Sequence, residues 1–230
     1  MRLFTNTKLI ERQARIARYA TFGGLAVLVG SLLLSFTSEN ILLAYVTLSV
    51  GFILAYIGSA LANKYIREPR ADHALEKALK GFDNKHQLYN FLLPAPHVLL
   101  TPNGLIVFKV KPNEGRVMLE GEKWREPFRL SRVFGGMGRE PLANPGAQLR
   151  AEIARLKKFL ATKMSNAALV PIDGYVIFTD PKVQLELNGA RVQVARADDL
   201  KDTLRKIKRG APLKPELIAE LEKILGEFVG

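Results

Sequence analysis

Residues 104–115 read GLIVFKVKPNEG, an apolar strand that follows a turn and ends in two lysines. Successive side chains of a strand point to opposite faces, so Lys109 and Lys111 share a face with Leu105 and Val107. Apolar residues occupy both faces as far as Lys109, which is typical of a strand buried on both sides. We therefore expect a central strand whose end directs two ammonium groups to one place.

Turn signals lie on both sides of this strand. Pro102-Asn-Gly104 predicts a tight turn, because Asn-Gly accepts positive φ, and makes 97–102 the hairpin partner of 105–111. Pro112-Asn-Glu-Gly115 predicts a second turn, after which 116–120 pairs on. The central strand is thus expected within an antiparallel meander.

The rest of the soluble part alternates helical and strand patterns. Asn144 is a good N-cap and Pro145 suits a first helical turn. The predicted elements are an amphipathic helix at 71–82, a long helix from 145 with Leu149, Ile153, Leu156, Leu160 and Met164 as its core stripe, a buried strand at 174–180, a hairpin of 183–187 and 191–195 around Asn188-Gly189, and helices at 198–209 and 213–228. This order predicts a three-layer α/β domain, with helices packed on a mixed central sheet.

Two uncharged runs precede that domain, at 19–38 and 40–63. Each is long enough for the roughly 20 residues that a membrane-spanning helix needs. The link TSEN allows only a tight connection, so we expect a transmembrane hairpin over 19–63 with helices at about 19–37 and 41–63. A signal peptide is disfavoured because no small-residue cleavage site follows the first run, and a buried soluble hairpin because both runs are so long.

Basic residues flank the hairpin and are absent from its tip. Since lysine and arginine stay on the cytoplasmic side, the chain is expected to be integral to the cytoplasmic membrane with both termini cytoplasmic. Residues 1–18 then form a basic cytoplasmic tail, which either lies along the membrane surface or is simply solvated. Residues 71–230 form the cytoplasmic domain.

Composition restricts the partners. The 230 residues carry a formal net charge of +12 and no cysteine, which excludes disulfides and thiolate metal sites. Excess positive charge favours anionic partners, either nucleic acid or lipid headgroups, besides the bilayer itself. The candidate binding residues are Lys109, Lys111, Arg150, Lys157 and Lys158.

Four segments in order, EKALKGF (76–82), HVLLTPNGLIVFKVKPNEGRV (97–117), NPGAQLRAEIARL (144–156) and YVIFTDPKVQL (175–185), resemble the nuclease-related domain (NERD) family. The likeness covers about 72–208. It implies a restriction-endonuclease-like fold and a site in which carboxylates hold Mg²⁺ for phosphodiester hydrolysis while a lysine stabilises the developing charge.

Compared with the family pattern, the chain has the expected residue at some site positions and a different residue at others. The matching residues are Glu76, His97, Lys111, Asn144, Pro145 and Gln148. The family's aspartate is replaced by Pro96 and its strand glutamate by Lys109, so both metal ligands are missing. The resemblance thus implies a degenerate site at Glu76, Pro96, Lys109, Lys111 and Gln148, with no metal and no catalysis.

Three functions stay open. The first is a catalytically inactive binding or scaffolding module, with nucleic acid as the first ligand to test. The second is a nuclease dependent on Mg²⁺ or Mn²⁺, with a carboxylate relocated to Glu114, Glu120 or Glu122. The third is a structural assembly protein with a membrane-protein partner. Independently of these, the two lysines are also explained as the charged end of an edge strand, and Glu76 as their ion-pair partner.

Overall fold

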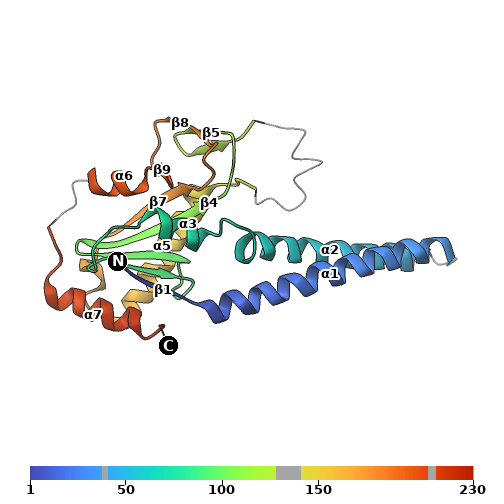
Figure 1. Cartoon of the computed structure of the whole chain (residues 1–230), viewed down its shortest axis with the longest axis horizontal. Coiled ribbons are helices and arrows are strands. Elements are labelled where there is room, and N and C mark those ends of the chain that lie inside the picture. Colours follow the sequence, from blue (N-terminus) through green and yellow to red (C-terminus); the bar gives the residue numbers. More distant parts are fainter. Residues whose placement is uncertain (38–40, 128–140, 207–210, 230) are drawn as a thin grey trace. The chain divides into compact units, whose positions relative to one another are not determined.

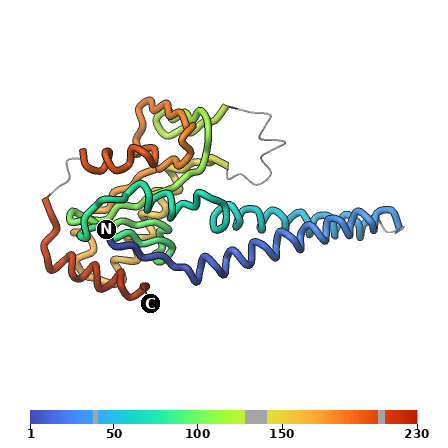
Figure 2. Tube along the Cα trace, in the orientation of Figure 1, coloured from blue at the N-terminus to red at the C-terminus, as the bar shows by residue number. Residues whose placement is uncertain are grey.

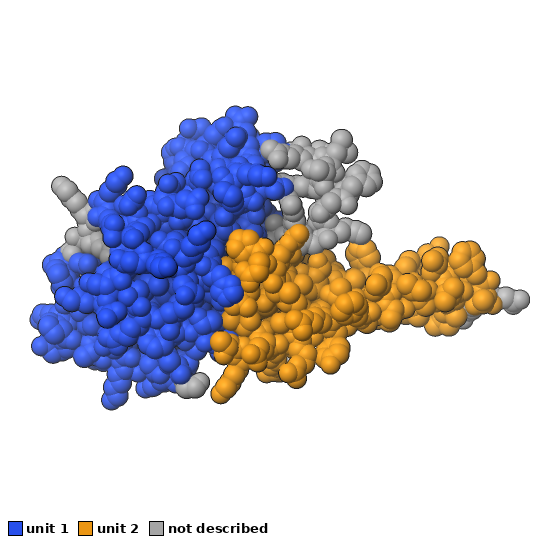
Figure 3. Space-filling view, viewed as in Figure 1, with its two compact units in different colours: residues 1–6, 71–128, 141–230 blue, residues 7–70, 129–140 orange. Residues whose placement is uncertain are grey.

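The computed structural model describes residues 1–37, 41–127, 141–206 and 211–229. They form two compact units, shown in different colours in Figure 3. One contains residues 1–6, 71–127 and the described residues from 141 onward. The other contains residues 7–70. Each unit has its own packing contacts.

The smaller unit is a hairpin of two long helices, α1 (Thr7–Thr37) and α2 (Ile41–Tyr65). They include the apolar segments predicted at 19–37 and 41–63, and α1 begins twelve residues before the first of these. Both are long and apolar enough to cross a membrane. In the most apolar window of each helix only 11% of the residues are buried. A core helix of a soluble protein would be mostly buried, whereas these helices expose their leucine, phenylalanine and tyrosine side chains.

Close packing of small residues joins α1 to α2. The buried positions recur every seven residues: Ile10, Ala17, Gly24 and Ser31 on α1, and Gly51, Gly58 and Tyr65 on α2. A Cβ placed on Gly24 would lie 2.5 Å from the Ala55 backbone nitrogen, so only glycine fits there. A seven-residue period is typical of helices that wrap around each other in a left-handed supercoil.

The larger unit is built on a six-stranded mixed sheet in the order β1-β2-β3-β4-β7-β9 (Figure 1). Its strands are β1 (Arg2–Thr5), β2 (Gln87–Asn90), β3 (His97–Thr101), β4 (Gly104–Lys111), β7 (Ile172–Phe178) and β9 (Gln193–Arg196). The predicted β3–β4 hairpin is confirmed, with Gly104 at φ +140° opposite Thr101. Strand β4 lies between β3 and the parallel β7, which confirms its central position.

Helices cover both faces of this sheet, as the sequence predicts. They are α3 (Ala71–Ala78), α5 (Pro145–Lys163), the short 3₁₀ helix η1 (Ala167–Leu169), α6 (Leu200–Lys206) and α7 (Pro215–Gly226). Residues of α5 and α7 share one apolar cluster with Leu105 and Val107 of β4. Residues of α3 and α6 share another with Ile106 and Phe108. The domain therefore has three layers, helix, sheet and helix.

The first residues of the chain are part of this sheet. Strand β1 pairs in parallel with β2 from Arg2↔Gln87 to Thr5↔Asn90, so the start of the chain lies beside the strands that follow the hairpin (Figure 2). The Phe4 ring stacks on Tyr89 with the ring centroids 5.1 Å apart. The sequence predicts a single basic tail over residues 1–18. The structure instead divides them between β1 and the first turns of α1, because four residues with alternating contacts suffice to extend an existing sheet edge.

Two predicted strand pairings are wrong. Strand β5 (Arg116–Glu120) does not pair with β4, and β8 (Gln184–Asn188) does not form a hairpin with β9. Instead β5 lies between β6 (Lys123–Arg125) and β8 in a separate three-stranded sheet. Turn residues mark where a strand ends, but the partner of the next strand is chosen by tertiary packing, which local sequence does not encode.

Candidate functional site

The end of β4 directs Lys109 and Lys111 toward α5. Leu105 and Val107 precede them on the same face and belong to the cluster that contains the α5 residues. The prediction that both lysines share one face is therefore confirmed, and so is the apolar character of the strand that carries them. The sequence offered Glu76 as an ion-pair partner of these lysines, and the structure shows a different one for Lys109.

Lys109 meets a glutamate of α5. Its Nζ donates to Glu152 Oε1 at 2.9 Å, and the carboxylate is buried, with 4% of Glu152 exposed. The position of Glu152 is fixed by the helix start, where Asn144 Oδ1 accepts from the Ala147 amide. Glu152 then lies between the buried Leu149 and Leu156 on the inward side of the helix. Sequence reasoning missed this residue, although it is the only acid of α5.

Lys111 is fully buried at the end of the strand. Its Nζ lies 3.5 Å from the carbonyl oxygen of Pro141, on the segment that leads into α5. An ammonium group in this position stabilises the local backbone. It is not exposed to a ligand at the surface, so the structure gives no support to Lys111 as a direct binding residue.

Three buried acceptor atoms in this region have no hydrogen-bond partner among the described residues. They are Gln148 Oε1 and Glu152 Oε2, one turn apart on α5, and Asn113 Oδ1, two residues beyond Lys111. The Asn113 amide nitrogen itself donates to Glu126 Oε1 at 2.8 Å. Buried acceptors left in this way are expected to take a donor such as a water molecule. Within the described residues, no group of three or more histidines and carboxylates could hold a metal ion.

Pro96 falls beside Lys109. Strand β3 pairs antiparallel to β4 with Val98 opposite Val107, and Pro96 comes just before β3 at the end of the pair where Lys109 lies. His97 points to the other face, where its Nδ1 is 2.8 Å from Asn90 Oδ1. That hydrogen bond and the Phe91 ring packed against it make His97 a structural residue.

Glu76 does not lie with this cluster. It is an exposed residue of α3, whose inward side chains Leu75 and Leu79 pack on the Ile106 face of the sheet. The sheet therefore separates Glu76 from Lys109. The expectation that Glu76 pairs with the lysines is wrong, because the long helix supplies Glu152 on the face where the lysines lie.

The family model for "Nuclease-related domain" matches residues 64–179, just over half of the chain. The chain belongs to the nuclease-related domain family. Searches of curated proteins and of solved structures found no significant match.

The family match includes the Lys109–Glu152 ion pair. The match spans both partners, together with β3 and its flanking Pro96. At the two positions where the family pattern stated above has acids, this nuclease-related domain carries a proline and a lysine. Among the described residues on that face, the buried carboxylate of Glu152 forms an ion pair with Lys109 at 2.9 Å.

The outer side of α5 is strongly basic. Its only acid, Glu152, points inward, so every exposed charge of the helix is positive: Arg150, Arg155, Lys157, Lys158 and Lys163. Two of these have acidic neighbours, since Arg150 is 3.5 Å from Glu122 and Lys163 is 3.0 Å from Glu227. The predicted binding residues Arg150, Lys157 and Lys158 thus lie on one exposed helix.

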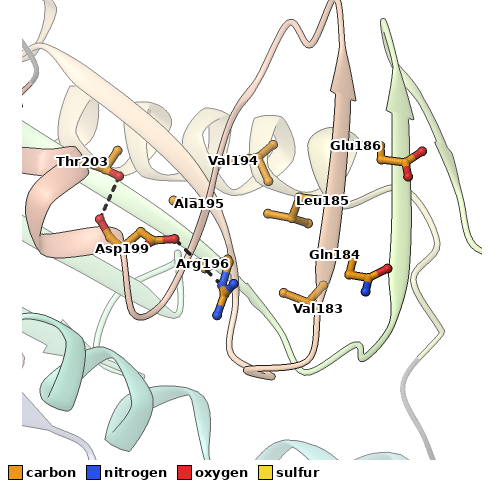
Figure 4. Close-up of a pocket in the computed structure, with 9 residues that line it drawn as sticks. All are labelled: Val183, Gln184, Leu185, Glu186, Val194, Ala195, Arg196, Asp199 and Thr203. Atoms are coloured by element: carbon orange, nitrogen blue, oxygen red, sulfur yellow. Dashed lines mark hydrogen bonds and ion pairs between the residues drawn. The ribbon is translucent and has the colours of Figure 1, made fainter.

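A separate groove of about 560 Å³ lies between β8, β9 and α6 (Figure 4). Arg196 projects into it, with its Nε 3.9 Å from Asp199 Oδ2, and Leu185 and Val194 form apolar walls. Neither Lys109 nor Glu152 lines this groove. It is therefore distinct from the cluster at the end of β4.

Proposed function

We propose that this chain is a membrane-anchored nuclease-related domain that binds its ligand without cleaving it, with nucleic acid as the first ligand to test. The observation that carries the proposal is the 2.9 Å ion pair between Lys109 and Glu152. It places an ammonium group where the family pattern has a carboxylate, against the one buried carboxylate on that face of the sheet.

Metal-dependent phosphodiester hydrolysis needs several carboxylates around the cation. Here Pro96 supplies no oxygen from its side chain, and Lys109 supplies positive charge. Two unit charges of the same sign about 4 Å apart repel by roughly 4 kcal/mol at an effective dielectric of 20. A divalent cation beside Lys109 would meet that repulsion twice over, which argues against Mg²⁺ or Mn²⁺ as a cofactor.

Binding is supported by the exposed basic side of α5. Lysine and arginine side chains that neutralise phosphates supply sequence-independent affinity for nucleic acid, and this affinity falls steeply with salt. Lys157 and Lys158 are both exposed and lie about two turns beyond Arg150, so one helix side presents several cations to a phosphate backbone. We assign direct contact to these residues rather than to the buried Lys111.

Anchoring is supported by the two apolar helices and by the strand that precedes them. Strand β1 comes before the hairpin and β2 after it, yet the two are hydrogen-bonded neighbours. Both ends of the hairpin must then lie on the same side of the membrane. Because the flanks of the hairpin are basic, that side is the cytoplasmic one, and both termini are cytoplasmic.

The test uses the full chain in detergent. Incubation with plasmid, single-stranded DNA and RNA in Mg²⁺ or Mn²⁺ should give no cleavage, while fluorescence anisotropy should show binding that weakens steeply with salt. Lys157→Glu/Lys158→Glu should reduce affinity and salt dependence. Lys182→Glu/Lys214→Glu, which makes the same charge change at exposed sites elsewhere, should not. If no binding is detected at low salt, the binding proposal is wrong and the structural role is favoured instead.

One observation favours the nuclease alternative. The unpartnered Asn113 Oδ1, Gln148 Oε1 and Glu152 Oε2 are oxygen ligands of the kind that a hard cation takes. Cleavage that needs Mn²⁺ and disappears in Glu152→Gln would establish a rearranged catalytic site and overturn the proposal.

A further inference from the structure

We propose that the base of the helical hairpin binds the headgroups of anionic phospholipids through cations that its two helices hold at the same level. These cations, the basal cluster, are Lys8, Arg12, Arg15 and Arg18 of α1 together with Lys64 and Arg67 at the end of α2. The inference rests on the proposed membrane anchoring and adds to it a lipid class and the residues that select it.

The register of the hairpin sets these levels. Gly24 faces Ala55 and Gly58 faces Thr21 in an antiparallel pair, so facing residue numbers add up to 79. The same sum places Arg15 level with Lys64, which lies in the last turn of α2. Arg67 follows the end of α2 at Tyr65, and its amide closes the last turn by donating to the Ala62 carbonyl oxygen at 2.8 Å. Its guanidinium group donates to Asn63 Oδ1 at 3.1 Å.

The basal cluster begins where the apolar surface of both helices ends. Arg18 is the last charge before the first uncharged run, and Lys64 is the first charge after the second. From Arg12 to Arg18 the helix rises about 9 Å. The polar layer on each side of a bilayer is about 5–8 Å thick. The cluster therefore spans the depth at which lipid phosphates lie.

The side chains of α1 in this cluster are exposed. The buried residues of this part of α1 are Ile10 and Ala17, which lie on a different side of the helix from Lys8, Arg12 and Arg15. In the described parts of the chain, no hydrogen bond or ion pair is found for the side chains of the four α1 cations, Lys8, Arg12, Arg15 and Arg18. Three of the four are arginines, whose planar guanidinium groups suit bidentate contact with phosphate oxygens. Their depth favours the phosphates of lipids over those of a soluble polyanion.

The experiment reconstitutes the full chain into vesicles of equal phosphatidylcholine and phosphatidylglycerol, then identifies the lipids that remain bound by native mass spectrometry. Phosphatidylglycerol should be enriched on the wild-type chain. Arg12→Gln/Arg15→Gln should lower that enrichment by roughly fivefold for each cation removed. The charge-preserving Arg12→Lys/Arg15→Lys should retain it, and so should the matched control Arg125→Gln/Arg191→Gln in the soluble domain.

Flotation of the vesicles separates this inference from the anchoring on which it rests. A chain that fails to float with the vesicles defeats the membrane anchor. A chain that floats but retains both lipids equally defeats the headgroup site alone. Equal losses in the α1 variant and in the soluble-domain control would also overturn the site, as would an α1 variant that loses nucleic-acid affinity while its lipid enrichment is unchanged.

Discussion

Lys109 Nζ and Glu152 Oε1 lie 2.9 Å apart, although one belongs to a strand and the other to a helix 43 residues later. The carboxylate is buried, and one fifth of the lysine side chain is exposed. In such a pair each charge compensates the other, whereas either charge buried alone would destabilise the fold. The same contact neutralises the carboxylate that a metal ion would need, so one ion pair links the stability of the domain to its proposed lack of catalysis.

Removing one partner should therefore destabilise the domain. Glu152→Ala leaves the Lys109 ammonium in a largely buried place without a counter-charge, and we expect a loss of about 3 kcal/mol in the free energy of unfolding. Urea unfolding of the full chain in detergent, followed by fluorescence of the single tryptophan Trp124, measures it. Lys109→Met/Glu152→Leu should recover most of the loss. A small loss in Glu152→Ala would show that solvent already screens the pair.

Reversing the charge at one position should create a cation site. Lys109→Glu puts a second carboxylate beside Glu152, next to the unpartnered Gln148 Oε1. Repulsion between the two carboxylates lowers stability without metal, and Mn²⁺ should raise the melting temperature, because a ligand that binds only the folded state stabilises it. Thermal unfolding with and without Mn²⁺ checks this. An equal rise in the wild-type chain would contradict the proposal that Lys109 excludes the metal.

These two experiments address a residue that the sequence reasoning did not find. The shared face of Lys109 and Lys111 follows from strand alternation, which is a local rule. Glu152 is hard to recognise from sequence, because it is a single acid between the apolar residues of the buried helix stripe. Only its inward position, which requires a partner for the charge, indicates a role. Glu76 was assigned to the site although the sheet separates it from Lys109.

The fold shows the same division between local and tertiary information. The two apolar helices, the Asn144 N-cap and the Asn103-Gly104 turn follow from local chemistry and are confirmed. The partners of β5 and β8 and the incorporation of β1 into the sheet depend on contacts between distant segments. Four polar-flanked residues before a membrane helix carry no pattern that predicts a strand.

The helical hairpin should tolerate a side chain at Gly23 but not at Gly24. A Cβ on Gly24 would lie 2.5 Å from backbone, whereas nothing lies within 4 Å of one on Gly23. Overpacking costs about 1–3 kcal/mol, so Gly24→Leu should weaken helix association roughly fivefold or more. The chain has no cysteine, so disulfide formation in Ala17→Cys/Ala62→Cys, two positions level by register, reports the association. Equal rates with Gly23→Leu and Gly24→Leu would refute this packing.

Alkaline pH should destabilise the domain through Tyr89. Its hydroxyl donates to Gln87 Oε1 at 2.9 Å in a buried position, and burial, assisted by the charge of Glu222, raises the pKa of Tyr89 from 10.0 to about 12. A raised folded-state pKa gives stability that is complete below pH 10 and lost as pH rises through about 12.

Tyr89→Phe isolates this effect from the titration of other groups. We expect the free energy of unfolding of the wild type to fall faster than that of Tyr89→Phe between pH 10 and about 12. Urea titrations across that range, again followed by Trp124 fluorescence, measure the two slopes. Parallel slopes would mean that the phenol ionises as readily in the folded chain as in the unfolded one.

The pairing of β1 with β2 makes a prediction about membrane topology. Since the strands before and after the hairpin share one sheet, single cysteines at the exposed Lys8 and Lys85 should be labelled from the same side of the membrane. A cysteine at Thr37, at the far end of α1, should be labelled from the opposite side. A membrane-impermeant maleimide applied to intact cells should react with Thr37→Cys alone, and with all three variants after the membrane is opened. Labelling of Lys8→Cys but not Lys85→Cys in intact cells would be incompatible with the sheet, because β1 could then not reach β2.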